Sequence, residues 1–459
     1  MTIKEARNLL DKGEITSVEL AKQYLEKEDN LNAYLEIFDD VEEQAKRADK
    51  MIEEGDIHPL TGIPLAIKDN ILIKGHIVSG ASKILENYQA SYDAHVIEKL
   101  KEQGAVLIGR TNMDEFAMGS STENSAYGVT KNPHDVNRVP GGSSGGTAAA
   151  VAGDLAIAGL GTDTGGSIRQ PAAFCGLVGF KATYGVVSRY GAMAMGSSLD
   201  QIGPLTTTVE DSKILFDAIR GYDKRDATSL NVEVDTTEPK IIGVPRSSLK
   251  GVDEDVLKSF EESLEKMKKE GYEIVDIDLP NVKYSLAAYY IVMPAEASTN
   301  LARYDGVRYG VKKEGDDLLG DYLETRGSGF GAESRRRILI GAFVLSAGYA
   351  DAYYRKAEAV RDQIRGDFKE AFSKVDVIAT PTTPTPAFKI GEKSDDPLSM
   401  YAADIFTVPA NLAGIPAISI PMGTVSRDGV DLPIGMQFLA PHKQDDSLFK
   451  IGKKFETIE

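Results

Sequence analysis

Two neighbouring loops rich in glycine and serine offer hydroxyl groups that could do chemistry. One loop covers 140–147 and contains Ser143, and the other covers 161–171 and contains Ser167. Glycine allows unusual backbone conformations and close approach of a ligand, and consecutive peptide N–H groups in such loops can bind an anion. Ser167 is therefore a candidate nucleophile, next to a candidate oxyanion hole in the backbone of Thr164, Gly165, Gly166 and Ser167 itself.

A nucleophilic serine needs a base, and histidine is scarce in this sequence. The chain has five histidines, and neither loop contains one. Lys68 directly follows 63–67, an apolar run of strand length. Burial favours the neutral form of a lysine, and a pKa lowered from about 10.4 to about 7–8 makes the amine a competent base near neutral pH. The alternative is a lysine that only caps a sheet edge.

Other interpretations of the two loops stay open on the residues alone. A phosphate-binding loop requires the pattern G-x-x-x-x-G-K-[ST], which the sequence lacks. Gly141–Gly145 fits the G-x-S-x-G motif of an α/β-hydrolase, but a strand should precede that motif, and His442 is the only histidine after it. The single cysteine, Cys175, is another candidate nucleophile, although it has no basic neighbour. The loops could also serve packing alone.

Hydrophobic patterns predict strands that alternate with helices. Residues 1–55 have the pattern of helices, with a capping box at 16–19. Strands are predicted over 63–67, 106–109, 241–244, 375–380, 417–421 and 433–439. Helices are predicted over 93–103, 209–221, 253–270 and 333–373. This alternation indicates an α/β fold with helices packed on a mixed, mostly parallel sheet.

No linker, repeat or low-complexity tract interrupts this pattern. We therefore expect one large domain over 1–459, with a helical segment over 1–55, a catalytic core near 60–205 and a helical excursion near 285–370. Hydrophobic residues make up 42% of the chain, which is enough to bury a large core.

Charge and cysteine content narrow the functional classes. The chain has 52 basic and 70 acidic side chains and a formal charge of −18, so its surface should repel phosphate backbones. If nucleic acid is involved, we expect another chain to bind it. One cysteine permits neither a disulfide framework nor a cysteine-based zinc cluster, which fits a reducing compartment. The first residues lack the apolar core of a signal peptide, so we expect a cytoplasmic protein with no membrane contact.

Taken together, the two loops resemble the sequence block that defines the amidase signature family. Lys68, Ser143 and Ser167 are spaced as in that family. The resemblance implies a Ser-cisSer-Lys triad, in which Ser167 attacks an amide carbonyl and its proton passes through Ser143 to neutral Lys68. It also implies a single α/β/α domain, a cis peptide between Gly142 and Ser143, and a supporting ion pair between Asp163 and Arg169.

Within the family, the stretches 112–124, 301–306 and 400–404 resemble the glutamine-hydrolysing subunits of tRNA-dependent amidotransferases. Glutamine carries an α-carboxylate and an α-ammonium group, so its pocket needs a cation and an anion. The resemblance implies that Arg337 binds the α-carboxylate, because a planar guanidinium can donate two parallel hydrogen bonds to it. It also implies that Asp404 binds the α-ammonium group. It also places at the substrate the residues Tyr289, Met118 and Gly119. For Arg337, a solvated helix charge is the alternative.

The same resemblance implies partners and cofactors. We expect a heterotrimer with amidotransferase subunits B and C, in which this chain supplies ammonia from glutamine. No metal or cofactor is expected here; ATP and Mg²⁺ would be used in the partner subunit, which would also bind most of the tRNA. The overall activity is that of a carbon–nitrogen ligase with glutamine as amido donor.

Two alternatives to this function stay open. One is a stand-alone amidase of broad specificity, whose pocket for uncharged amides does not need Arg337 and Asp404. The other is a scaffold that assembles a complex without catalysing a reaction.

Overall fold

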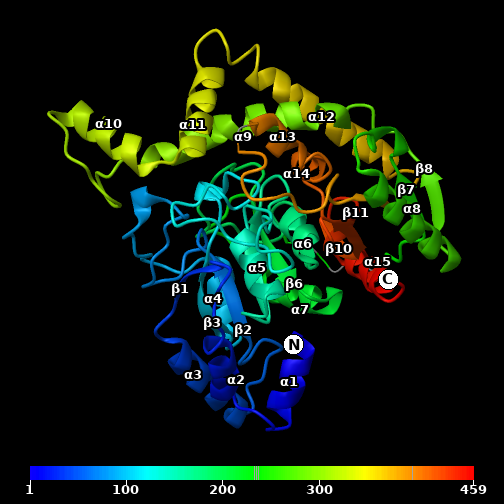
Figure 1. The fold of residues 1–459 in the computed structure, drawn as a ribbon, viewed down its shortest axis with the longest axis horizontal. Coiled ribbons are helices and arrows are strands. Elements are labelled where there is room, and N and C mark those ends of the chain that lie inside the picture. The colour runs from blue at the N-terminus through cyan, green and yellow to red at the C-terminus, as the bar shows by residue number, and fades with distance from the viewer. Residues whose placement is uncertain (232, 234, 236, 395) are drawn as a thin grey trace.

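One sheet of eleven strands runs through the protein in a computed structural model that describes residues 1–231, 233, 235, 237–394 and 396–459 (Figure 1). The strand order is β1-β3-β2-β4-β6-β5-β10-β11-β9-β7-β8. The strands are β1 (Tyr34–Ile37), β2 (Pro64–Lys68), β3 (Val106–Thr111), β4 (Ala158–Asp163), β5 (Val178–Lys181), β6 (Gln201–Thr206), β7 (Ile241–Val244), β8 (Glu273–Asp276), β9 (Val377–Pro381), β10 (Ala417–Arg427) and β11 (Val430–Leu439). The α-helices are α1 (Ile3–Asp11), α2 (Ser17–Leu25), α3 (Val41–Glu54), α4 (His95–Glu102), α5 (Gly145–Ala152), α6 (Arg169–Cys175), α7 (Val209–Ile219), α8 (Glu254–Lys269), α9 (Ser285–Asn300), α10 (Leu318–Gly329), α11 (Ala332–Leu345), α12 (Tyr354–Ala371), α13 (Pro397–Ala402), α14 (Val408–Ala413) and α15 (Asp445–Glu456).

The sheet is mixed, as expected, but the prediction that it is mostly parallel is wrong. Among the described residues, four neighbouring strand pairs are parallel and six are antiparallel. One cause is the hairpin of β10 and β11, where Asp428 (φ 55°) and Gly429 (φ 81°) form the connection. Positive φ at both residues is typical of the two-residue hairpin turn that Asp-Gly favours. The sequence contains this turn signal.

Short strands account for most of the missed elements. The hydrophobic patterns do not predict β1, β4, β5, β6 and β8, each of four to six residues. The expectation of a purely helical segment over 1–55 is also wrong, because β1 pairs antiparallel with β3 at the sheet edge. This pairing depends on a partner strand far along the chain, which local periodicity does not reveal. The helix expected over 333–373 forms two helices, α11 and α12.

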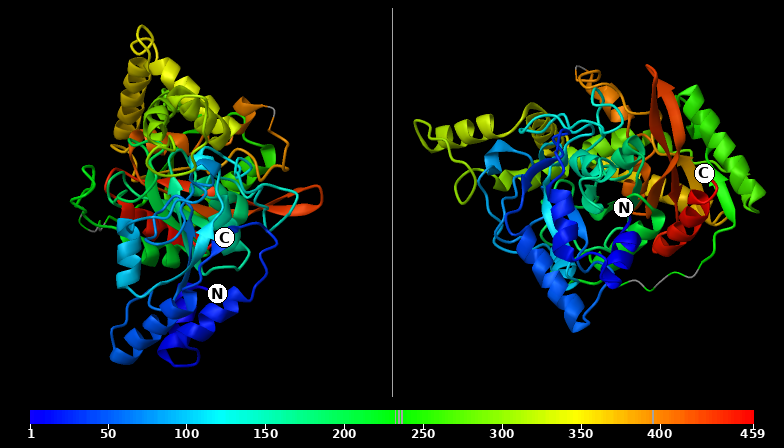
Figure 2. Two further views of the ribbon diagram at one scale, coloured as in Figure 1. Left: turned by 90° about the vertical axis from the view of Figure 1, so that its left-hand side faces the viewer. Right: turned by 60° about the horizontal axis from the view of Figure 1, so that its bottom comes forward.

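Helices cover both faces of the sheet, and β5 shows how. Gly179 lies so close to α6 that a Cβ atom there would be 2.6 Å from Ala172 Cβ. The next residue, Phe180, contacts Phe216 of α7 and Phe449 of α15. Since successive strand residues point to opposite faces, α6 lies on one face and α7 with α15 on the other. The result is an α/β/α arrangement, seen from two further directions in Figure 2.

The helices α9 to α12 form a layer at one end of the molecule, at the top of Figure 1. α9 packs against α11, α12 and α14. A second hydrophobic cluster fills this contact and includes Tyr289, Val292, Ile364 and Val408. No helix among the described residues is long and apolar enough to cross a membrane.

Lys68 and the loop that contains Ser167 lie at the same end of two neighbouring strands. β2 pairs in parallel with both β3 and β4. Lys68 is the last residue of β2, Thr111 the last of β3 and Asp163 the last of β4. Because the carboxyl ends of parallel neighbours lie together, the segments that follow these strands meet there.

Candidate active site

Lys68 is fully buried, and its amine lies among hydroxyl groups. Lys68 Nζ is 2.8 Å from Ser143 Oγ, 2.8 Å from Ser144 Oγ and 2.8 Å from Thr162 Oγ1. The Thr162 carbonyl oxygen is 3.4 Å away. The amine therefore joins the end of β2 to the start of α5 and the end of β4.

The hydrogen bonds around these hydroxyls restrict where each proton goes. Ser144 Oγ donates to the Thr162 carbonyl at 3.1 Å and accepts from Thr162 N–H at 3.2 Å, so Ser144 must accept from Lys68. A neutral amine has two protons and one lone pair. If it donates to Ser144 and Thr162, its lone pair is free to accept the proton of Ser143 Oγ.

Burial favours that neutral amine. It lowers the pKa of Lys68 to about 7, although the carboxylates of Asp114, Asp163 and Asp200 oppose the shift. Desolvation disfavours the charged form of any amine. The neutral form of Lys68 is therefore accessible near neutral pH.

Ser143 and Ser167 lie on adjoining loops. Ser143 is fully buried in the 140–144 loop, two residues before α5 begins at Gly145, and the Gly142–Ser143 peptide is cis. Ser144 N–H donates to the Ser167 carbonyl oxygen at 3.2 Å, which joins the two loops next to Ser143. Ser167 is 9% exposed, so it lies at the border between the interior and solvent.

The loop 164–167 presents backbone N–H groups at this border. No hydrogen bond to another described residue engages the N–H groups of Thr164, Gly165 and Ser167, whereas Gly166 N–H donates to Asp163 Oδ1 at 2.9 Å. Gly166 has φ 133°, and a Cβ atom there would lie 2.2 Å from Thr407 Oγ1. Glycine is therefore required at 166. An oxyanion site in this loop has three unengaged amides available rather than four.

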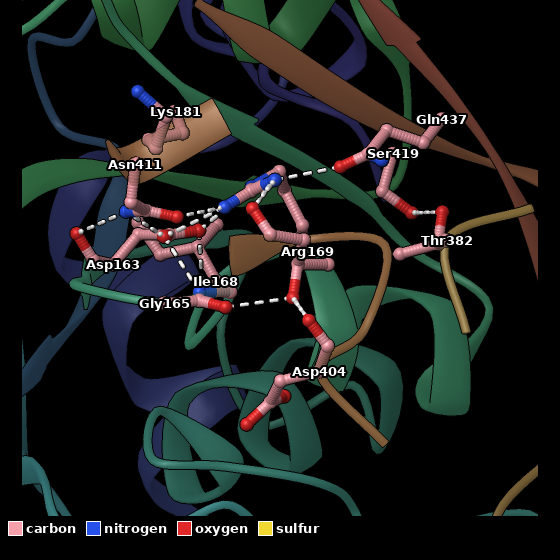
Figure 3. Close-up of polar contacts among 12 residues, drawn as sticks. Asp163, Gly165, Ile168, Arg169, Lys181, Thr382, Asp404, Asn411, Ser419 and Gln437 are labelled. Atoms are coloured by element: carbon pink, nitrogen blue, oxygen red, sulfur yellow. Dashed lines mark hydrogen bonds and ion pairs between the residues drawn. The ribbon is translucent and has the colours of Figure 1, made fainter. Parts of the chain in front are cut away.

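A buried ion pair between Asp163 and Arg169 lies beside the loop (Figure 3). Arg169 donates from Nε to Asp163 Oδ2 at 2.9 Å and from Nη2 to Asp163 Oδ1 at 3.0 Å. Burial is the largest influence on the pKa of Asp163 and acts to raise it, but the charge and hydrogen bonds of Arg169, together with Lys181 and Asn411, outweigh burial and the pKa falls to about 2. Asp163 also accepts from Gly166 N–H, so the pair fixes the backbone just before Ser167.

Arg169 reaches further elements as well. It donates to the Thr407 carbonyl at 2.9 Å, to Gln437 Oε1 at 2.6 Å and to Asn411 Oδ1 at 2.6 Å. These partners lie before α14, in β11 and in α14, respectively. The guanidinium is thus satisfied on all sides, and it couples the loop to the middle of the sheet.

Arg337 is also buried, and three kinds of group orient it. Its Nε donates to Glu333 Oε1 at 2.7 Å and its Nη2 to the Gly119 carbonyl at 2.8 Å. The guanidinium carbon is 5.3 Å from the ring centroids of both Tyr290 and Tyr401. Arg337 is therefore an inward-facing residue of α11, not a solvated helix charge.

Asp404 is a buried carboxylate with one oxygen unpaired. Its Oδ2 accepts from Ser120 Oγ at 2.6 Å, while Oδ1 has no hydrogen-bond partner among the described residues. Burial raises the pKa of Asp404 to about 7. An unpaired buried carboxylate oxygen calls for a donor, and a cationic ligand satisfies it.

The remaining predicted substrate residues are buried as well. Tyr289 packs on the nucleophile loop, since a Cβ atom at Gly165 would lie 2.7 Å from its ring. Met118 is buried, and Gly119 binds Arg337 through its carbonyl oxygen. A pocket of ≈170 Å³ opens beside them and is lined by residues that include Gly119, Glu333, Met400 and Tyr401.

The competing candidates fit the structure less well. The 140–144 segment before α5 is a loop, so the strand that should precede a hydrolase elbow is replaced by irregular chain. Cys175 is buried, its Sγ lies 3.3 Å from the Pro140 carbonyl oxygen, and burial raises its pKa. Within the described residues, no three His, Cys, Asp or Glu side chains form a group that could hold a metal ion.

Sequence reasoning missed several residues that contact the predicted ones. They are Ser120, Ser144, Thr162, Glu333, Tyr290 and Asn411. Glu333 lies four residues before Arg337, a helical spacing at which opposite charges meet, so this contact could be predicted. Most of the others adjoin predicted residues in the sequence, but the contacts they make join segments far apart in the chain, which no local pattern reveals.

Comparison with known proteins gives the family. A family model described as Amidase matches residues 17–449. The chain is 51% identical to the A subunit of the glutamyl-tRNA(Gln) amidotransferase of Desulfatibacillum aliphaticivorans, over 99% of this chain and 96% of that protein. It is 50% identical to the protein of the same name from Gloeothece citriformis, over 99% and 97%. The chain belongs to the amidase family, which confirms the resemblance found in the sequence.

Solved structures agree with this membership. The crystal structure of the corresponding A subunit of glutamyl-tRNA(Gln) amidotransferase from Thermotoga maritima matches with a TM-score of 0.82 and 42% identity, over 100% of this chain and 94% of that chain. The native peptide amidase of Stenotrophomonas maltophilia matches with a TM-score of 0.82 and 27% identity, over 100% and 96%. The predicted amidase signature fold is thereby confirmed.

The Asp163–Arg169 pair yields a stability prediction. Replacing Arg169 by Met leaves a buried carboxylate without its counter-charge, which typically costs about 3–5 kcal/mol. We expect urea unfolding of Arg169→Met to show a loss of that order. The matched control is Arg365→Met, which removes an exposed pair with Asp362 and should cost at most about 1 kcal/mol. Equal losses in the two variants would contradict the structural role of Arg169.

Proposed function

We propose that this chain is the glutaminase subunit of a tRNA-dependent amidotransferase and that it releases ammonia from glutamine. The observation that carries the proposal is the buried Lys68 amine within 2.8 Å of the Ser143 hydroxyl, next to the loop of Ser167. The names of relatives that are half identical over nearly the full chain point to the same activity.

In the proposed mechanism, Ser167 Oγ attacks the side-chain amide carbon of glutamine. The Ser167 proton passes to Ser143 Oγ, and the Ser143 proton passes to neutral Lys68. The unengaged N–H groups of the 164–167 loop stabilise the oxyanion that forms. Lys68 then returns a proton by the same relay to the leaving nitrogen, and ammonia departs. Water cleaves the acyl-serine by the reverse sequence and gives glutamate.

Recognition of glutamine rests on two opposite charges. Arg337 donates from Nε to Glu333, and its terminal nitrogens Nη1 and Nη2 face Met293 Sδ and the Gly119 carbonyl oxygen. Each terminal nitrogen has a second N–H group. These N–H groups suit the α-carboxylate of glutamine. The unpaired Oδ1 of Asp404 suits the α-ammonium group. Tyr289, Met118 and Gly119 form the wall between them.

The proposal extends to the assembly. Ammonia would pass to a partner, where ATP and Mg²⁺ activate glutamyl-tRNA(Gln), aspartyl-tRNA(Asn) or both. We propose a cytoplasmic heterotrimer with subunits B and C, in which the partner binds most of the tRNA. The net charge of −18 supports a division of labour in which this chain leaves nucleic acid to another subunit.

The buried charges favour this function over a broad amidase. A pocket for uncharged amides would leave the buried Oδ1 of Asp404 without a donor, which is costly. A scaffold without activity is disfavoured by the proton path from Ser143 to Lys68, which a purely structural role does not need.

The test of the proposed function is ammonia release from glutamine. We expect Ser167→Ala to lower kcat by at least about 10⁴-fold, as removal of a nucleophile does in other serine hydrolases. Cys175→Ala is the control and should keep the wild-type rate. If Ser167→Ala releases ammonia normally, or if wild type hydrolyses apolar amides and ignores glutamine, the proposal fails.

A second prediction concerns Glu333, which positions Arg337 without touching substrate. Glu333→Gln keeps an acceptor for Arg337 Nε but removes its charge, and a charge-assisted hydrogen bond is roughly twice as strong as a neutral one. The variant should therefore raise KM for glutamine several-fold, with kcat little changed. Hydrolysis of an uncharged primary amide, which lacks the carboxylate, should be unaffected. Glu324→Gln, an exposed change in α10, serves as control. A parallel loss on both substrates would indicate a general structural defect and contradict the assignment.

A further inference from the structure

Two buried amide oxygens without partners line the same small cavity. Asn70 Oδ1 and Gln201 Oε1 make no hydrogen bond within the described residues, although Asn70 is 2% and Gln201 1% exposed. Both side chains line a cavity of ≈10 Å³. That is about the room that one water-sized molecule needs. Buried polar atoms are rarely left unpaired, so two in one cavity indicate a missing partner.

The two unpaired side-chain oxygens of this cavity are acceptors. Thr164 Oγ1, a possible donor in the lining, already donates to Asp200 Oδ1 at 2.7 Å. Arg189 directs its guanidinium N–H groups at Asp226, Ser197 and Thr228. A molecule that pairs with both oxygens must therefore donate hydrogen bonds.

The cavity adjoins the catalytic amine. Asn70 Nδ2 donates to Thr162 Oγ1 at 3.0 Å, and Thr162 Oγ1 is 2.8 Å from Lys68 Nζ. Thr162 and Thr164, on either side of Asp163, also line the cavity. A molecule in it thus lies one side chain away from Lys68.

The cavity also leads toward the surface. It shares Arg189, Ala192 and Asp200 with a pocket of ≈240 Å³. That pocket shares no lining residue with the one beside Arg337 and Tyr401. The cavity therefore adjoins a pocket other than the one beside Arg337 and Tyr401.

We infer that Asn70 Oδ1 and Gln201 Oε1 bind one small hydrogen-bond donor, of the size of water or ammonia. The site is the cavity that Thr162 separates from Lys68. Water would come from solvent through the Arg189 pocket. Ammonia would come from the reaction, a source that rests on the proposed function. Either molecule fixes the Asn70 amide so that its Nδ2 keeps donating to Thr162.

The first arm of the test is a crystal structure of the full chain at about 1.5 Å resolution, grown without ammonium salts. We expect an electron-density peak within hydrogen-bond distance of both amide oxygens. The peak should vanish in Gln201→Leu and persist in Ile202→Leu, a control that changes an apolar wall residue of the cavity. An empty cavity in wild type, or a peak that persists in Gln201→Leu, overturns the inference.

The second arm separates the two sources with hydroxylamine, a small N–H and O–H donor. Hydroxylamine attacks the acyl-Ser167 ester, forming the C–N bond of glutamyl hydroxamate and freeing the serine hydroxyl, in competition with water, which gives glutamate. If ammonia uses the site, Gln201→Leu should lower the hydroxamate-to-glutamate ratio and Ile202→Leu should leave it unchanged. An unchanged ratio in both variants assigns the site to water and overturns its use by ammonia.

The two arms keep this inference apart from the proposed function. A chain with no glutaminase activity yields no hydroxamate and refutes the proposed function, while the density peak still decides whether the site exists.

Discussion

Burial of the Lys68 amine is the constraint on which the rest of the site depends. A lysine in water holds its proton at neutral pH, whereas desolvation at the end of β2 brings the pKa to about 7. A buried amine without hydrogen bonds would destabilise the fold. The hydroxyl groups of Ser143, Ser144 and Thr162, each 2.8 Å from Lys68 Nζ, supply those hydrogen bonds. When the neutral amine donates its two protons to Ser144 and Thr162, its lone pair is available to Ser143. The same contacts that stabilise the buried lysine thus direct its basicity.

The fold supplies this environment through parallel strands and a second buried cation. β2 and β4 end side by side, which sets Lys68 next to Asp163 and the loop that follows. Arg169 compensates Asp163 and binds groups before and within α14 and in β11, so the loop is anchored to parts of the chain far apart in sequence. Arg169 therefore ties the Ser167 loop to α14 and β11, and these contacts restrict the movement of the loop.

The sequence predicted the parts of the structure that have local signals. The apolar run before Lys68, the glycine loops and the capped amphipathic helices each have such a signal, and they correspond to β2, the 141–147 and 161–167 loops and helices such as α2. Short strands such as β5, with four residues, carry too little periodicity, and β1 depends on an edge partner. Ser120 and Thr162 acquire their roles only from segments that meet in three dimensions. Arg337 could be assigned from resemblance, but its orientation by Tyr290 and Tyr401 could not.

Direct titration of the Lys68 amine by nitrogen-15 NMR on lysine-labelled protein tests the central claim most directly. Lys181 is also buried and has its pKa lowered to about 7 by burial, so the Lys68 resonance must be assigned as the one lost in Lys68→Met. Because burial favours the neutral form, the amine should gain its proton only as the pH falls through about 7. A Lys68 amine that stays charged up to its ordinary pKa of about 10.4 would contradict the account.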